Sequence, residues 1–262
     1  MSTFTHYNIA FKTQLRVIFA LVLRETRVTY GTTSLGYLWA ILEPVFGTLL
    51  LVTIFSAITR APPIGTNFAL FFGTGILVFQ AYRKLTSSLM GVFKANKGLM
   101  TYPLVKTLDV VFARGLLIML TNILILFAFF GALIIFIGAP VPRHIEQTML
   151  AFFATILLGW SGGLNNAVLI VIWPTWQQIE GILARPLFFI SGVFFIPASF
   201  PPEVRYWLAW NPILHAIEWF REGYYGSYNS VVLDKNYVLG WILVLLFTGF
   251  YGERIYRKKI TE

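Results

Sequence analysis

The stretch LGYLWAILEPVFGTLLLVTIFSAI, residues 35–58, is strongly apolar and carries a single charged side chain, Glu43. About 20 predominantly apolar residues are enough for a helix to cross the hydrocarbon core of a bilayer. The composition agrees, because 57% of the 262 residues are hydrophobic and 12% are charged, whereas soluble domains are about 25% charged. The sequence therefore predicts an integral membrane protein.

Five further apolar stretches follow the first one along the chain. They occupy residues 68–89, 110–137, 147–173, 179–196 and 237–251. Segments rich in proline and glycine mark the loops between several of them. We expect an all-α polytopic membrane protein in which residues 1–262 form one transmembrane domain with six membrane-spanning helices, the fifth kinked by Pro186.

Residues 11–30 differ from the spans that follow them. Their longest apolar run, 17–23, is too short to cross a membrane. Apolar side chains nevertheless recur at helical spacing, and lysines and arginines surround them. We expect an amphipathic helix that lies in the membrane interface. Its predicted apolar stripe consists of Phe11, Leu15, Ile18, Phe19 and Val22.

Residues 203–225 also differ, since they hold two short apolar and aromatic pieces, 203–210 and 213–225, that carry several charges. Neither piece is long enough to span. Short helices are tolerated at membrane depth where protein buries them or where they line a cavity. We expect two re-entrant or interfacial helices on the outer side.

The boundary between these two pieces has the residues of a helix start. Asn211 suits the N-cap of the second piece, and Pro212 suits its first helical position. Glu218 and Arg221 lie three residues apart, so they can pair on one face of the helix. Taken alone, this pattern predicts a capped helix with an internal ion pair.

Lysine and arginine positions orient the chain. Placing both termini in the cytoplasm puts roughly 15 of the 20 basic residues on the inner side and about five on the outer side, as the positive-inside rule requires. The reverse topology would invert that ratio. The net charge of +9 is thus explained by topology, and no nucleic-acid partner is needed to account for it.

The sequence lacks the residues that several enzyme classes require. There is no cysteine, no spacing of the three histidines that would suit a metal, and no G-x-x-x-x-G-K-[ST] phosphate loop. The string GWSGG at 159–163 matches a hydrolase elbow by letter, but it lies inside a predicted span, where its glycines suit helix packing. We expect no catalytic or metal-binding residues. A transport protein is one interpretation, and a membrane-bound glycosyltransferase or acyltransferase is the rival enzyme class.

Glu43 and Pro44 place a carboxylate and a helix kink within one span. One interpretation is structural, with Glu43 bonded to a neighbouring helix. The other is a polar position on a channel wall or a subunit contact. Aromatic side chains are also abundant. Most of them suit interface anchors or helix packing, and the other interpretation is a surface on which sugar rings stack.

Three stretches of the chain resemble one known family. They are LGYLWAILEP at 35–44, YPLV at 102–105 and NPILHAIEWFREGYYG at 211–226. Their order over nearly the whole chain resembles the permease subunit of type-2 ABC exporters, specifically the exporters of capsular polysaccharide or O-antigen in Gram-negative bacteria. The run VTYGTTSLGYLWA at 28–40 is similar to the capsule branch in particular.

The resemblance implies an ATP-driven exporter of lipid-linked capsular polysaccharide across the bacterial inner membrane, with its channel at the interface of a permease homodimer. ATP and magnesium would bind to a separate ABC ATPase, present in two copies, and this chain would hold no cofactor. Periplasmic and outer-membrane export proteins, membrane lipids and the glycan are the other implied partners. An O-antigen or teichoic-acid exporter permease and a gradient-driven flippase are the alternatives.

The resemblance also implies roles for particular residues. The predicted channel residues are Tyr37, Trp39, Glu43, Phe46 and Tyr82, although Tyr37 and Trp39 lie far apart around a helix. Contacts to the lipid anchor or to acidic sugars are predicted for Arg24, Arg27, Arg83 and Lys84, which would otherwise hold anionic lipid head groups. Coupling to the ATPase is predicted for a helix at 96–103 and for Arg16, Asn96, Lys97, Tyr102 and Pro103. The predicted gate residues of 203–225 are Arg205, Trp207, Asn211, Pro212, Glu218 and Arg221.

Overall fold

A computed structural model describes the backbone of residues 2–31, 34–58 and 61–261, and the side chains of residues 13–31, 36–55 and 61–261. The side chain of Phe11, first in the predicted apolar stripe, lies outside the described residues. Within the described ranges, every regular element is helical. The helices are α1 (Ser2–Tyr30), α2 (Ser34–Ile58), α3 (Phe68–Met90), α4 (Val92–Ala95), α5 (Thr107–Ile137), α6 (Ile145–Ile172), α7 (Trp176–Ile190), the 3-10 turn η1 (Pro197–Ser199), α8 (Pro202–Leu208), α9 (Pro212–Tyr225) and α10 (Lys235–Thr261).

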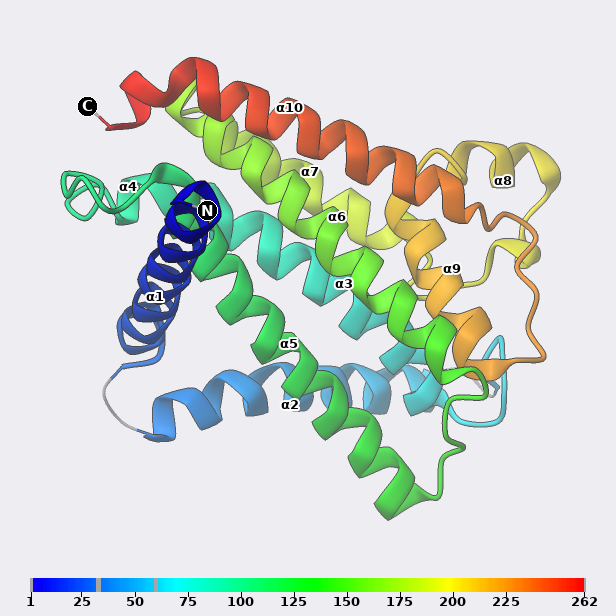
Figure 1. Cartoon of the computed structure of the whole chain (residues 1–262). Helices are drawn as coiled ribbons and strands as arrows, with labels where there is room; N and C mark the ends of the chain where they lie inside the picture. The colour runs from blue at the N-terminus through cyan, green and yellow to red at the C-terminus, as the bar shows by residue number, and fades with distance from the viewer. Residues whose placement is uncertain (1, 32–33, 59–60, 262) are drawn as a thin grey trace.

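The centre of the bundle is the pair α3 and α6, with α5, α9 and α10 packed around it (Figure 1). All residues of α3 from 69 to 79 are buried. Two glycines on α6 allow the close approach of the central pair. A Cβ atom on Gly159 would lie 2.9 Å from the carbonyl oxygen of Tyr82, and one on Gly163 would lie 2.9 Å from that of Leu85. The string GWSGG is therefore a packing surface within α6.

Replacing Gly159 or Gly163 with alanine is expected to lower the free energy of unfolding by about 1–3 kcal/mol, because the backbone of α3 would have to move away from the added methyl group. Thermal unfolding in detergent measures the effect. Gly131→Ala in α5 and Gly240→Ala in α10 are matched controls, since no atom lies within 4 Å of a Cβ at either position. Equal effects at all four glycines would contradict this account of the packing.

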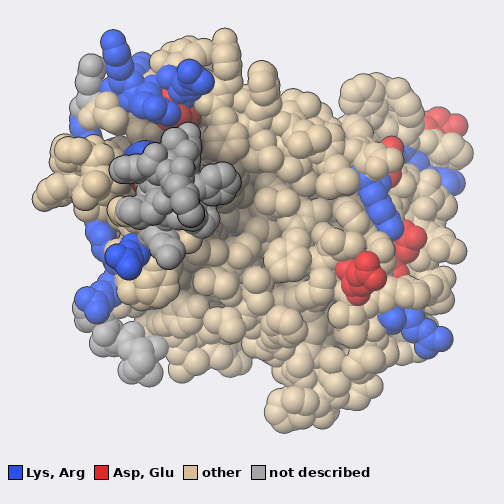
Figure 2. All heavy atoms as spheres, in the orientation of Figure 1, with Lys and Arg blue, Asp and Glu red and all other residues tan. Residues whose placement is uncertain are grey.

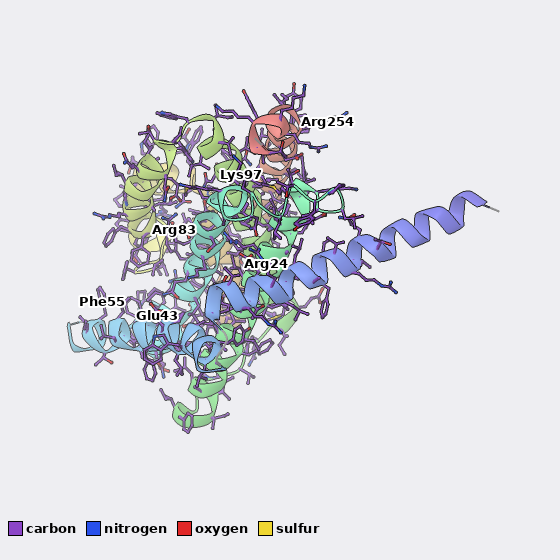
Figure 3. The ribbon with its side chains drawn as sticks, turned by 90° about the vertical axis from the view of Figure 1, so that its left-hand side faces the viewer. Arg24, Glu43, Phe55, Arg83, Lys97 and Arg254 are labelled. Carbon is purple, nitrogen blue, oxygen red and sulfur yellow. The ribbon has the colours of Figure 1, made fainter. Side chains whose placement is uncertain are left out.

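Helix α1 lies across one end of the bundle. Figure 3 looks at this end, and α1 extends far to one side of the long helices. Among its described side chains, the buried ones are Leu21, Val22 and Glu25, which share one face, and α1 packs against α5. The helix begins at Ser2, well before the predicted start at residue 11, and Gly31 follows it with φ +78°.

Charged residues gather at the two ends of the molecule. In Figure 2, lysines and arginines cluster at the end that holds α1, α4 and the C-terminus, while a smaller group of both signs lies near α8 and α9. The band between these ends shows almost no charged atoms in this view. This distribution is typical of a protein whose middle is surrounded by lipid.

Four of the described helices are long and apolar enough to cross a membrane: α2, over Gly36–Phe55, and α5, α6 and α10. The other two predicted spans correspond to α3 and α7. Helix α3 has 23 residues and carries Arg83 and Lys84 near its end. Helix α7 has 15 residues, or about 22 Å of length, less than the hydrocarbon core of about 30 Å.

Two predicted helices are corrected by the structure. The fifth predicted span, 179–196, ends at Ile190, because the chain turns at Ser191 and at Gly192, which has φ +77°. The coupling segment at 96–103 is not a helix. Helix α4 stops at Ala95, and residues 96–104 form turns. The Asn96 amide bonds back to the carbonyl of Val92, at 3.0 Å, and so terminates α4.

Candidate functional site

A groove of about 830 Å³ lies between part of α2 and the rest of the bundle. Its other walls come from the end of α1, from α3 and α5, and from Phe188 of α7. Figure 3 shows Glu43 and Arg83 on the same side of the molecule, away from the free end of α1. Both residues line the groove, so it brings together elements that lie far apart in the sequence.

Helix α2 contributes a wall of small residues. Gly36, Ala40, Pro44 and Gly47 all line the groove, and their spacing of four, four and three places them on one face of the helix. The helix backbone itself therefore forms much of this wall. Pro44 has no N–H group, so it cannot bond the carbonyl of Ala40 one turn earlier.

Polar side chains concentrate on the facing walls. Gln80, Arg83, Lys84 and Ser87 of α3, and Thr121 and Asn122 of α5, line the groove. Of the residues predicted to contact the substrate, the groove holds Trp39, Glu43, Arg83 and Lys84. The Arg83 guanidinium also forms an ion pair with Glu180 of α7. The groove thus combines basic groups, aromatic rings and an acidic group.

The other residues predicted to contact the substrate do not line this groove. Tyr37 packs edge-on against Tyr30, with ring centroids 5.1 Å apart. Phe46 is 59% exposed, and Tyr82 lies at the contact of α3 with α6, where its backbone faces Gly159. Arg27 is exposed on α1. Their roles in transport stay predictions.

A cluster of phenylalanines joins α2 to α3 and α7 beside the groove. The ring of Phe194 lies 5.1 Å from that of Phe55, 5.8 Å from that of Phe72 and 5.0 Å from that of Phe188. The Phe188 ring also meets that of Phe79 at 5.0 Å. Phe79 and Phe188 line the groove, so this apolar cluster forms one of its boundaries.

The turn after α4 projects from the end of the bundle where α1 lies (Figures 1 and 3). Lys97, Tyr102 and Pro103 are exposed there, and Asn96 is buried. The Arg24 side chain of α1 donates a hydrogen bond to Asn96 Oδ1 at 2.6 Å. Arg16 is exposed further along α1. The Arg24–Asn96 hydrogen bond joins α1, which carries Arg16, to the turn at 96–104. The coupling role predicted for Arg16 and for this turn stays a prediction.

Sequence comparison shows that residues 16–225 match the family described as ABC-2 type transporter. The chain belongs to the ABC-2 type transporter family. The polysialic acid transport protein KpsM of Escherichia coli is 34% identical over 244 residues, 91% of this chain and 93% of KpsM.

Two other relatives in this family are more distant. The capsule polysaccharide export inner-membrane protein BexB of Haemophilus influenzae is 28% identical over 248 residues, 94% of this chain and 93% of BexB. The O-antigen export system permease protein RfbA of Klebsiella pneumoniae is 22% identical over 267 residues, 98% of both chains. These relatives are transport proteins, so this ABC-2 chain is a membrane transport subunit and not an enzyme.

The predicted gate residues of this ABC-2 transport subunit divide into two groups. Arg205 and Trp207 lie on α8, where Trp207 is 73% exposed and the Arg205 Nε donates to the Phe200 carbonyl at 2.7 Å. Asn211 and Pro212 start α9, and Asn211 Oδ1 accepts a hydrogen bond from the Ile213 N–H at 3.0 Å. Neither group lines the groove.

Helix α9 is held in the core by the predicted pair Glu218 and Arg221, both fully buried and 3.2 Å apart. The Arg221 guanidinium also donates to three backbone carbonyls, those of Gly192, Val193 and Phe195. Glu218 accepts hydrogen bonds from Tyr228 and Ser230. Burial and the Glu218 carboxylate raise the pKa of the Tyr228 hydroxyl, so it stays protonated and remains a donor.

Three charged residues that form ion pairs were given no role by the sequence analysis. Glu25 is 4% exposed on α1 and pairs with Arg114 of α5, and Glu180 pairs with Arg83. Arg114 offered a signal, because an arginine near the end of an apolar span needs a partner. Nothing in the sequence indicated that this partner would be Glu25.

Proposed function

We propose that this chain is the membrane subunit of an ATP-driven exporter that moves a lipid-linked capsular polysaccharide across the inner membrane. The observation that carries the proposal is the groove, in which Arg83 and Lys84 lie beside a wall of small residues and aromatic rings. A phosphate or carboxylate would bind the basic groups, and a sugar chain would slide along the wall. The relatives KpsM and BexB are named for polysaccharide transport.

The channel in this proposal forms between two copies of the chain. Only 11% of the α2 span is buried, compared with 56% for α6, and α7 has no buried residue. Both helices border the groove and expose large apolar side chains, including Phe46 and Leu50 on α2 and Ile182 and Phe189 on α7. A second copy would cover these faces and close the groove into a channel.

The proposed topology has six spans, α2, α3, α5, α6, α7 and α10, with both termini in the cytoplasm. The lysines and arginines around α1, α4 and the C-terminus support it, because basic residues favour the cytoplasmic side (Figure 2). In this arrangement α8 and α9 lie on the periplasmic side as gate helices, where further export proteins would bind. Because α7 is too short to cross the membrane alone, neighbouring spans would cover the rest of the membrane depth beside it.

A dimer of ATPase subunits would bind at the cytoplasmic end and hold the ATP and magnesium. The exposed turn at 96–104 is the proposed contact. Its link to α1 through Arg24 and Asn96, and the link of α1 to α5 through Glu25 and Arg114, give a continuous route from the ATPase to a helix that lines the groove. We propose that movement of the ATPase reaches the groove along this route.

Replacing Lys97 and Tyr102 with alanine is expected to weaken ATPase binding about tenfold or more, because a projecting tyrosine commonly contributes much of an interface's affinity. Both side chains are exposed, so the fold should be retained. Co-purification and coupled export in proteoliposomes measure the effect. The control is Tyr206→Ala, since Tyr206 is 60% exposed on α8, at the opposite end of the molecule (Figure 1). Unchanged binding and export in the double variant would refute the coupling role.

The function itself is tested in a capsule-forming strain that lacks its own export permease. Expression of this chain with its partner ABC ATPase should restore polysaccharide at the cell surface, and an ATPase variant unable to hydrolyse ATP should leave the polysaccharide inside. Restoration without any ATPase would favour the gradient-driven flippase. A strain that lacks an O-antigen exporter tests the second candidate, which the similarity to RfbA supports.

A further inference from the structure

Arg83 lies where two hollows meet. It lines the 830 Å³ groove, and it also lines a second hollow of about 410 Å³ along α7, together with Gly181, Arg185 and Phe189. Phe188 is the other residue that the two hollows share. A group bound to the Arg83 guanidinium can therefore be reached from either side of Phe188.

The Arg83 guanidinium is occupied by a carboxylate of its own chain. It pairs with Glu180 of α7, and the two side chains are 29% and 14% exposed. Among the described residues, Arg83 is the one cation within ion-pair distance of Glu180. This pair joins α3 to α7, which also meet through the rings of Phe79 and Phe188. It differs from Glu218–Arg221, in which both side chains are fully buried.

The surroundings of the pair carry excess positive charge. Lys84 lines the groove beside Arg83, and Arg185 lines the second hollow. Three basic side chains thus line the two hollows, and the described carboxylates there are Glu180, which pairs with Arg83, and Glu43, which lines the groove. A partly exposed ion pair contributes little net stability, whereas arginine binds phosphate through two parallel charge-assisted hydrogen bonds. An incoming phosphate that also binds Lys84 can therefore replace the Glu180 carboxylate at Arg83.

We propose that Glu180 is a resident counter-ion, which the anionic head group of the transported molecule displaces from Arg83. Arg83 and Lys84 then bind the head group, and the ion pair between α3 and α7 is broken. Molecules without an anionic group leave the pair intact, so Glu180 makes entry selective for anions. This inference rests on the proposed function in one respect, that the groove admits the transported molecule.

The test measures binding, independently of transport. The purified chain in nanodiscs of phosphatidylcholine is titrated with fluorescent lysophosphatidic acid, with lysophosphatidylcholine, and with a lipid-free oligomer of galacturonic acid. We expect Glu180→Gln to bind lysophosphatidic acid about fivefold more tightly than the unchanged protein, the effect of one unit charge near a membrane surface. Arg83→Gln should weaken binding, and it should abolish the gain when combined with Glu180→Gln. A merely structural pair would give no gain in affinity.

The test distinguishes a lipid phosphate from an acidic sugar as the anion that binds, and control variants exclude an effect of charge removal elsewhere. Tighter binding of lysophosphatidic acid alone assigns the site to a lipid phosphate, and a matching gain for the galacturonate oligomer assigns it to acidic sugars. Glu203→Gln removes an exposed acid of α8 and should change nothing. If Glu180→Gln is unstable, Glu180→Ala serves as a second neutral variant.

Unchanged or weaker binding in folded Glu180 variants would overturn the counter-ion role, and so would a gain that persists without Arg83. Failure of the unchanged chain to restore capsule in cells would instead count against the proposed function. The two failures are thus distinguishable, since one is seen in binding and the other in export.

Discussion

Replacing Gly47 with leucine is expected to stop export while leaving the protein folded. Gly47 lines the groove, and no atom of the described residues lies within 4 Å of a Cβ built at this position. The Cβ of the new side chain therefore meets no described neighbour, and leucine favours a helix over glycine by about 0.8 kcal/mol. Its bulk would stand in the path proposed for the polysaccharide. Surface polysaccharide should fall to the level seen with an inactive ATPase.

Matched variants separate a blocked groove from a damaged helix. Gly131→Leu in α5 and Gly240→Leu in α10 make the same change where a Cβ also meets no atom within 4 Å, and both residues lie outside the groove lining. These two variants should export normally. Normal export by a folded Gly47→Leu variant would show that the polysaccharide takes another route.

Replacing Arg221 with methionine is expected to lower the free energy of unfolding by about 3–5 kcal/mol, because Glu218 would remain buried without its cation. The carbonyl oxygens of Gly192, Val193 and Phe195 would also lose their shared donor. The segment after α7 should then detach from α9. Thermal unfolding, and proteolysis near residue 192, would measure the two effects.

An ion pair with one exposed partner provides the comparison for Arg221. Arg257 pairs with Glu253 at 2.9 Å, and the Arg257 side chain is 57% exposed although that of Glu253 is buried. Because water reaches the guanidinium and Thr107 also donates a hydrogen bond to Glu253, Arg257→Met should lower stability less than Arg221→Met does. Replacing both Glu218 and Arg221 with apolar residues should recover part of the loss, since no buried charge would remain. Equal losses at Arg221 and Arg257 would contradict the importance of burial.

The sequence predicted the helical character well, and it did so through simple physical signals. Long apolar stretches predicted α2, α5, α6 and α10, and a capping asparagine followed by proline predicted the start of α9. The end of α7 was missed, because residues 191–196 are as apolar as the helix before them. The chain leaves the helix where Gly192 takes φ +77°, and the hydrogen bonds from Arg221 to the carbonyls that follow are tertiary contacts that the local sequence does not show.

The groove could be predicted only in part. Glu43 and Trp39 drew attention through their chemistry, and the helix period alone left their direction open. The placement of Arg83 beside Glu180 depends on how α3 and α7 pack, since the two residues are 97 positions apart. The four small residues of α2 were visible in the sequence. Their role as a wall of the groove, however, depends on how the described helices pack, since these leave the space beside α2 open.

That wall of small residues has a consequence for the range of cargo. In the proposed channel, a wall made largely of helix backbone would offer few side chains that distinguish one sugar repeat from another. Selectivity would then depend on the facing walls, where Gln80, Thr121 and Asn122 could bond a sugar hydroxyl and Arg83 and Lys84 an anionic group. The proposed exporter would therefore distinguish its cargo from one side only.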